Sequence, residues 1–168
     1  NGLEKQYLND EINKYFKEAI KKLNMQKEII EYINTQKVGV LAVEILDGSP
    51  HAATVHFAFD EKNQVFYFET YREYRKAEAL FGRDTSRASF VIGTSEDTKI
   101  TLQIDGEVTL IKDDEKENYN AVYFNKFPNK IEKSKDPKFV SFKFTPKWWR
   151  FTDWTNPSGK IIINYNEK

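Results

Sequence analysis

The stretch of sequence that decides the fold is VFYFETYREYRKAEALFGRDTSRASFVIG, residues 65–93. Almost every residue of its first part is large, as expected for a strand that is covered on both faces. A charged segment with helical spacing follows at residues 71–81. Residues 87–94 are again rich in β-branched and aromatic residues, so the stretch predicts a strand, a short helix and a second strand.

Further strands are predicted on both sides of this stretch. A Gly inside the strand expected at 99–111, Gly106, indicates a bulge. A helix is expected from Asp113 to about Phe127. The remaining strands are predicted at residues 38–46, 51–59, 139–144, 148–154 and 160–165. Because strands and helices do not alternate regularly, we predict a mainly β fold, an antiparallel β-barrel with flanking helices.

The N-terminal part has a helical pattern of its own. Apolar residues recur at steps of three and four from Leu8 to Leu23. We expect a break at Asn24 and a second helix over residues 26–35. The predicted organisation is therefore a helical extension, residues 1–24, and a barrel domain, residues 25–168.

Composition excludes several function classes. Lys plus Arg number 26 and Asp plus Glu also number 26, so the basic excess typical of nucleic-acid binding is absent. No apolar run approaches the roughly 20 residues that span a bilayer. The chain has no Cys, and its two His lie on opposite faces of one predicted strand, so we expect no metal site. We expect a cytoplasmic protein without nucleic-acid or membrane partners.

Three cations stand at the start of the helix predicted over residues 71–81: Arg72, Arg75 and Lys76. Positive side chains there oppose the helix dipole, and a bound anion would relieve the conflict. In the alternative interpretation this is a solvated turn in which Glu73 and Glu78 neutralise the cations.

The order of several short motifs resembles a known family. Gly48-Ser49-Pro50, Phe66–Thr70, Tyr74-Arg75-Lys76 and Ile104–Val108 follow one another as in the pyridoxamine 5'-phosphate oxidase-like proteins, the FMN-binding split barrels. The resemblance extends from Ile29 to Ile111. It implies a homodimer with FMN at each of two interface sites.

The resemblance also implies residue roles. Arg75 and Lys76 match the basic pair that holds the FMN phosphate. Four further positions match residues along the ribityl chain and ring: Thr54, Val55, Glu69 and Thr70. Thr101 matches a position where pyridoxamine phosphate oxidases carry Gln.

An isoalloxazine ring needs an apolar slot with a few polar groups at its edge. We expect Val55 and Phe68 to contribute to that slot, with His56 close to the ring. The run Trp148–Trp154 allows two interpretations. Either Trp149 and Arg150 reach the flavin of the partner subunit, or they pack the barrel; for Trp148 and Trp154 we favour packing.

The sequence departs from the oxidases at two positions. Ala53 and Ala58 stand where those enzymes carry Arg and Lys, and the C-terminal substrate motif is absent, so oxidation of vitamin B6 is not expected. We expect an FMN-dependent oxidoreductase that acts on a small molecule, with unassigned catalytic residues. The alternative is a non-catalytic split barrel that binds a flavin or haem. FMN and a related deazaflavin are not distinguished.

Overall fold

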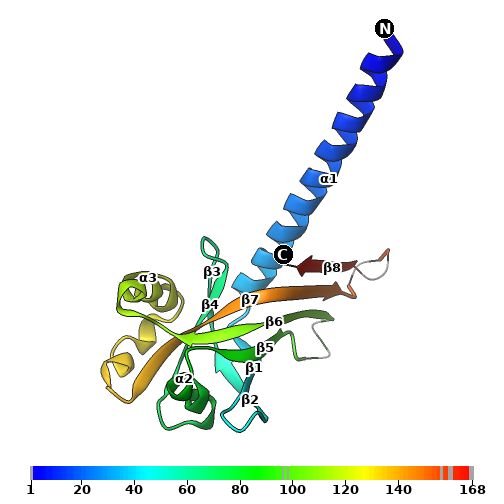
Figure 1. The fold of residues 1–168 in the computed structure, drawn as a ribbon. Coiled ribbons are helices and arrows are strands. Elements are labelled where there is room, and N and C mark those ends of the chain that lie inside the picture. Colours follow the sequence, from blue (N-terminus) through cyan, green and yellow to red (C-terminus); the bar gives the residue numbers. More distant parts are fainter. Residues whose placement is uncertain (1, 96, 98, 156, 159–160, 167–168) are drawn as a thin grey trace. The chain divides into compact units, whose positions relative to one another are not determined.

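The computed structural model describes residues 2–95, 97, 99–155, 157–158 and 161–166 (Figure 1). Within these ranges it describes no side chains for residues 2–5, 7–8, 16–26 and 162–166. Contacts between residues divide the chain into two units, Asn1–Ile33 and Asn34–Lys168.

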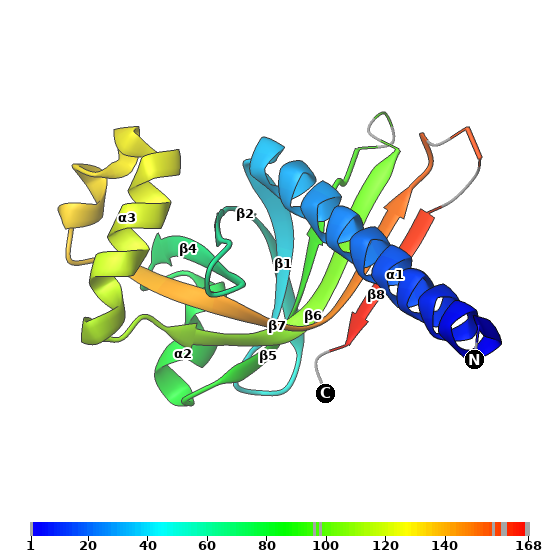
Figure 2. The same cartoon turned by 90° about the horizontal axis from the view of Figure 1, so that it is seen from above.

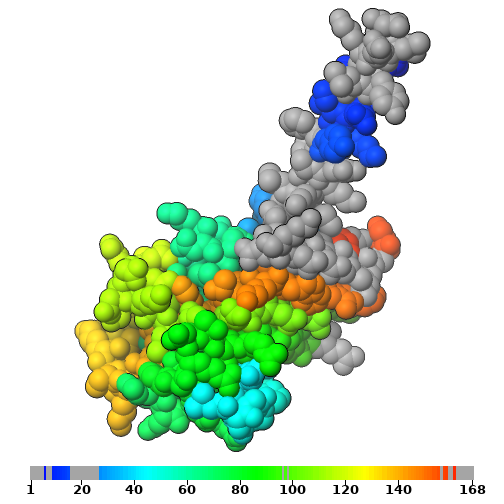
Figure 3. Space-filling model, in the orientation of Figure 1, coloured from blue at the N-terminus to red at the C-terminus, as the bar shows by residue number. Residues whose placement is uncertain are grey.

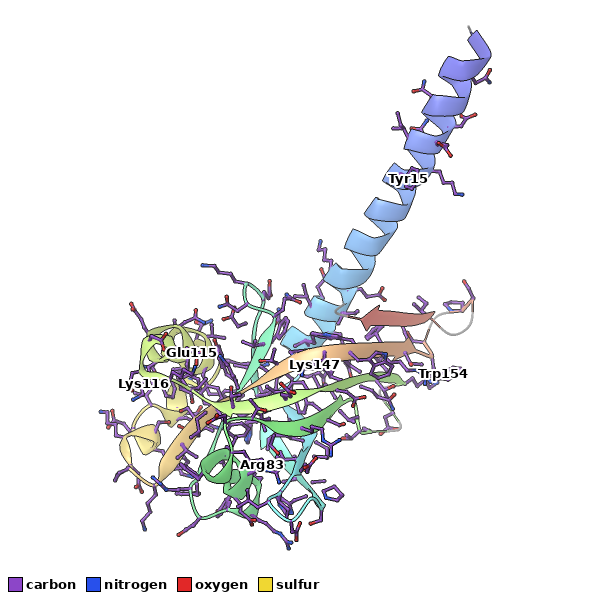
Figure 4. All side chains as sticks on the ribbon, in the orientation of Figure 1. Tyr15, Arg83, Glu115, Lys116, Lys147 and Trp154 are labelled. Carbon is purple, nitrogen blue, oxygen red and sulfur yellow. The ribbon has the colours of Figure 1, made fainter. Side chains whose placement is uncertain are left out.

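The first unit belongs to a single helix, α1 (Gly2–Thr35), so the break expected at Asn24 is wrong. Asn is a poor helix former but does not end a helix that strong formers flank on both sides. Ile12 and Tyr15 are exposed, and Figure 4 shows Tyr15 on α1. Leu8 and Leu23, the ends of the predicted apolar stripe, lie outside the described side chains. The division at residue 24 stays a prediction.

The second unit is one antiparallel sheet of eight strands, hydrogen-bonded in the order β2-β1-β5-β6-β7-β4-β3, with β8 also paired to β7. The strands are β1 (Val38–Glu44), β2 (Pro50–His56), β3 (Ala58–Asp60), β4 (Val65–Tyr71), β5 (Ser86–Ile92), β6 (Ile100–Leu110), β7 (Phe139–Asp153) and β8 (Ile161–Asn166). This mainly β, antiparallel architecture confirms the predicted fold class.

The sheet closes on itself through Phe57. β2 and β3 stand at opposite ends of the hydrogen-bonded order, yet only Phe57 separates them along the chain. The sheet therefore curls into a barrel, as Figures 1 and 2 show. The single strand predicted at 51–59 is wrong. At Phe57 the chain passes from β2, which pairs with β1, to β3, which pairs with β4.

One long strand accounts for the split in the barrel. Residues 139–144 of β7 pair with β4, and residues 148–153 pair with β8, while β6 pairs along most of the strand. The two strands predicted at 139–144 and 148–154 are therefore one continuous strand. A bulge in its middle explains the gap in the sequence pattern, since Pro146 cannot donate to a neighbouring strand.

That bulge confirms the irregularity predicted at Gly106. Asp105 pairs with Trp148 and Gly106 with Pro146, so one strand carries an extra residue, Lys147. The two backbones approach so closely that a Cβ atom at Gly106 would collide with the carbonyl oxygen of Thr145.

Gly106→Ala is expected to destabilise the protein by about 1–3 kcal/mol, because relieving this collision must displace backbone. Urea unfolding at equilibrium measures the difference. Gly48→Asn is the control: Gly48 has a φ of 86° and no atom near its missing Cβ, and Asn tolerates this conformation. Equal stability of Gly106→Ala and the unmutated protein would contradict the prediction.

Aromatic rings fill the barrel. Phe66 lies 5.3 Å from Phe90, 5.7 Å from Trp149 and 5.7 Å from Phe57, centroid to centroid. The opposite face of β4 is also covered, because Tyr67 packs on Tyr119 at 5.5 Å. Burial of β4 on both faces confirms the prediction from its bulky residues.

Short helices lie outside the barrel: η1 (Arg75–Ala77), α2 (Glu78–Gly82), η3 (Asp113–Glu115), α3 (Lys116–Lys126), η4 (Pro128–Lys130) and η5 (Lys133–Lys135). The helix predicted over residues 71–81 is wrong in its first part. Tyr71 still pairs with Phe139 in β4, and a turn follows before η1 begins. No helix of the described residues is long and apolar enough to cross a membrane.

Candidate functional site

Arg75 and Lys76 open η1, which lies beside β2. Arg75 is exposed, whereas Lys76 is half-buried with its ammonium 4.8 Å from the centre of the Tyr74 ring. Burial lowers the pKa of Lys76. Within the described part of the chain neither cation forms an ion pair with Glu73 or Glu78, the partners expected in the solvated-turn interpretation. Arg75 instead acts on the Asp47 carboxyl and lowers its pKa, so both interpretations of the pair stay predictions. The dipole argument also weakens, because the three-residue η1 replaces the start of the helix predicted over residues 71–81.

Thr70 stands at the end of β4 that leads towards η1. Its side chain is buried, and its hydroxyl has no hydrogen-bond partner in the described structure. Buried hydroxyls are nearly always paired, so an orphan needs an explanation. A ligand that brings an oxygen to this position would supply the missing partner.

Glu69 lies on the opposite face of β4 and meets a lysine-rich segment. Burial raises the pKa of the Glu69 carboxyl. The Ser134 hydroxyl, Lys130 and Lys133 act against that increase, in this order. Lys130 also donates a hydrogen bond of 2.9 Å from Nζ to the Tyr123 hydroxyl.

Aromatic rings lie between the lysine-rich segment and Lys76. The Lys133 ammonium lies 5.4 Å from the Tyr71 ring, and the Tyr71 and Tyr74 rings are 5.1 Å apart. We name the following residues the lysine–tyrosine network: Glu69, Tyr71, Tyr74, Lys76, Tyr123, Lys130 and Lys133. Cations alternating with aromatic faces suit a flat, negatively charged ligand.

β2, which lies beside η1, exposes alternate residues along its length. Thr54 and His56 are exposed, and Val55 is buried on the opposite face. The His56 ring lies 5.4 Å from Phe127, edge to face. Partial burial and then Lys130 lower the pKa of His56, so its imidazole is neutral at pH 7. Figure 3 shows α3 and the residues after it, yellow-green to orange, gathered at one end of the barrel unit.

Two predicted ligand-contacting rings lie in the barrel core instead. Phe68 stacks on Phe142 at 5.1 Å, and Trp149 is 6% exposed and packs on Phe66. Their position gives no support to a ring slot built from these two side chains. Trp154, for which we favoured packing, is 57% exposed and lies at the far end of β7 (Figure 4).

Thr101 and Arg150 lie far along the sheet from Arg75. Thr70 pairs with Val140, whereas Thr101 pairs with Thr152. Arg150 is thus ten positions further along β7 than the partner of Thr70, which is about 30 Å of extended strand. Within one chain these residues cannot contact the same small ligand as Thr70.

The sequence analysis missed Lys126, in the last turn of α3. Its ammonium is enclosed, has no hydrogen-bond partner among the described residues, and lies 4.4 Å from the Phe57 ring. Burial, with a smaller contribution from Lys37, lowers the pKa of Lys126 to about 8. Its lysine-rich sequence context, residues 126–138, was the available signal.

We expect Lys126→Met to stabilise the protein at pH 7 by about 1–3 kcal/mol. The folded state holds the proton of Lys126 less tightly than the unfolded chain does, whose pKa is near 10.5. Stability of the unmutated protein therefore rises as pH increases from about 8 towards 10. Urea unfolding at pH 7.0 and 9.5 measures both effects, and Lys126→Met removes most of the rise. A rise of equal size in both proteins would contradict this assignment.

A cavity of about 500 Å³ lies on the outer face of β1, β5 and β6, lined in part by Glu44, Arg87 and Lys147. Both cations that line it are already paired with carboxylates. Glu44 lies 2.7 Å from Arg83 and 2.5 Å from Arg87, and Lys147 lies 2.5 Å from Glu107 (Arg83 and Lys147 are labelled in Figure 4). It therefore offers a phosphate less than Arg75 and Lys76 do.

The residues present fit FMN in part. Arg75 and Lys76 would hold its phosphate, and the orphan hydroxyl of Thr70 would receive a hydrogen bond or donate one. Ala53 and Ala58 contribute no charge, as the sequence showed.

Comparisons with known proteins agree with this fold. Residues 25–153, more than half of the chain, match the family model described as pyridoxamine 5'-phosphate oxidase. A comparison with curated protein sequences yields no match.

Solved structures with the same fold have varied descriptions. A haem-binding protein from Mycobacterium smegmatis is 12% identical, with a TM-score of 0.62 over 78% of this chain, which spans only 53% of that protein. The haem storage protein of Vibrio cholerae is 19% identical, with a TM-score of 0.57 over 71% of this chain and 88% of its own. A Clostridium acetobutylicum protein of the pyridoxinephosphate oxidase family is 17% identical, with a TM-score of 0.56 over 83% and 92%.

At these identities the neighbours support the fold alone, whereas the family match covers β1 to β7 together with the cation pair and Thr70. The chain belongs to the pyridoxamine 5'-phosphate oxidase family.

Proposed function

We propose that this protein binds FMN and acts as an FMN-dependent oxidoreductase on a small molecule. The observation that carries the proposal is the pair Arg75 and Lys76, two adjacent cations that form no ion pair among the described residues. The Arg75 guanidinium is one of the groups that lower the pKa of the Asp47 carboxyl, so part of its charge already faces a carboxylate. A phosphate dianion is the ligand that such a pair favours. Thr70, near the end of β4 that precedes η1, has a hydroxyl without a hydrogen-bond partner in the described structure.

In this proposal the chain's residues bind and orient, and the flavin supplies the redox chemistry when it is bound. Arg75 and Lys76 hold the phosphate. Thr54 and His56 lie on the exposed face of β2 beside η1, where a ring edge would meet them. Burial raises the pKa of the Glu69 carboxyl and lowers that of the His56 imidazole, so both side chains are candidates for proton exchange.

We propose further that the protein is a homodimer. Thr101 and Arg150 lie about 30 Å of strand from Thr70 within one chain, so only a second copy can bring them to the same flavin. Two symmetric sites would follow, each with the cation pair of one protomer and the β6–β7 residues of its partner.

Titration of FMN fluorescence with the purified protein tests the proposal. We expect saturable quenching with one FMN per chain, and light scattering should give twice the chain mass. Full FMN fluorescence at high protein concentration would overturn flavin binding, and the chain mass alone would overturn the dimer. Bound flavin that neither NADH nor NADPH reduces would exclude both nucleotides as the electron donor.

Haem binding is the second candidate. The favouring observation is His56, an exposed imidazole whose pKa is lowered and which lies against the Phe127 ring. A neutral imidazole is a common axial ligand of haem iron. Titration with haemin tests this: a Soret shift that is lost in His56→Ala but kept in His51→Ala would favour haem.

A further inference from the structure

A second cavity, of about 550 Å³, is lined by residues of α2, α3 and the start of β7, among others. Figures 1 and 2 show where these elements lie in the barrel unit. Phe81, Phe124, Phe139 and Val140 supply much of its wall. Small-molecule sites are commonly concave, mostly apolar and of this size. Arg75, Lys76 and Thr70 do not line it, so it is separate from the proposed flavin site.

Large apolar side chains stand open at this cavity. Phe81 is 41% exposed and Ile131 is 43% exposed, and both line it. Clustered exposed apolar side chains beside a hollow mark a binding surface more often than a chance arrangement.

The cavity also contains an unused polar group. The Tyr119 hydroxyl is enclosed and has no hydrogen-bond partner in the described structure. Burial raises the pKa of Tyr119, so its proton stays available for donation. The Ser141 hydroxyl lies close by, without the geometry of a hydrogen bond to it.

Cations surround the apolar wall. The Arg72 guanidinium lies 4.2 Å from the Phe81 ring, and the Lys133 ammonium lies 5.3 Å from the Phe139 ring. Lys116 and Lys135 also line the cavity, and their carboxylate partners are almost fully exposed, so those ion pairs are weak. Asp136 also lines the cavity, so the edge carries charges of both signs. Arg72 and Lys133 form no ion pair among the described residues, so their positive charge favours an anionic group on the ligand.

We propose that this cavity binds a small carboxylic acid with an apolar ring or chain. The apolar part lies among Phe81, Phe124 and Phe139. The carboxylate lies at the cationic edge. The proposal does not require flavin binding, because Arg75, Lys76 and Thr70 do not line this cavity.

Calorimetric titration with 2-naphthoate tests the proposal, with 2-naphthamide as the uncharged probe of the same shape. We expect one naphthoate per chain and at least about tenfold weaker binding of the amide, since charge-assisted hydrogen bonds are lost. No saturable heat with naphthoate, or equal affinity for both probes, would overturn it.

Variants locate the binding. Ile131→Trp fills the mouth from an exposed position and is expected to weaken naphthoate binding at least about tenfold. Ile12→Trp, the same change at an equally exposed position of α1, leaves the affinity unchanged. Unchanged affinity in Ile131→Trp would place the ligand elsewhere and overturn the proposal. So would a changed molar mass of Ile131→Trp in light scattering, because a second copy would then cover the cavity. FMN affinity is the same in all three proteins if flavin binds.

Discussion

Replacing Arg75 and Lys76 together by glutamate is expected to abolish measurable FMN binding while the barrel still folds. Each charge-assisted hydrogen bond to a phosphate contributes about 1.5–3 kcal/mol, so loss of two weakens binding by roughly 100-fold to 10,000-fold. The introduced carboxylates add repulsion towards the dianion. Arg75 is exposed and Lys76 half-buried, so neither side chain belongs to the core.

The control must reproduce the change in net charge. Lys14→Glu with Lys62→Glu lowers the charge by the same amount at two exposed positions outside the site. Fluorescence titration of all three proteins at one ionic strength is the measurement, with circular dichroism to establish folding. If the Arg75–Lys76 variant binds FMN as tightly as the control, the phosphate is held elsewhere.

Trp149→Ala is expected to cost about 3–5 kcal/mol of unfolding free energy, enough to unfold a marginally stable domain. Trp149 is 6% exposed, and its ring lies 5.7 Å from Phe66 and 6.0 Å from Phe59. Truncation leaves a cavity among rigid rings that cannot collapse to fill it.

Trp154→Ala is the matched comparison, because it removes the same side chain just beyond the end of the same strand. Trp154 is 57% exposed, so we expect a loss below about 1 kcal/mol. Urea unfolding of both variants gives the two values. A larger loss for Trp154→Ala than for Trp149→Ala would mean that the aromatic core is assigned to the wrong face of β7.

Much of the fold could be predicted from local pattern. The bulky β4, the antiparallel class and the bulge at Gly106 follow from side-chain size, turn residues and the special backbone of glycine. These features depend on a few neighbouring residues, so they do not depend on which distant segments the chain contacts. The cation pair was also visible, because Arg75 and Lys76 are adjacent in the sequence.

The pairing of strands determined features that the local sequence pattern could not predict. A strand alternates two faces, and only its neighbours determine which face meets the core, so Trp149 is buried and Trp154 exposed. Likewise, nothing local marks Phe57 as the residue where the chain stops pairing with β1 and begins to pair with β4.

The site shows the same division. The sequence by itself determined the barrel class and an anion-binding pair after β4. Only the tertiary structure brought Lys130 and Lys133, some sixty residues further on, against Glu69. It also placed Arg150 far from Thr70 along β7. Contacts between distant segments depend on how the sheet curls, and that curl is a property of all the pairings together.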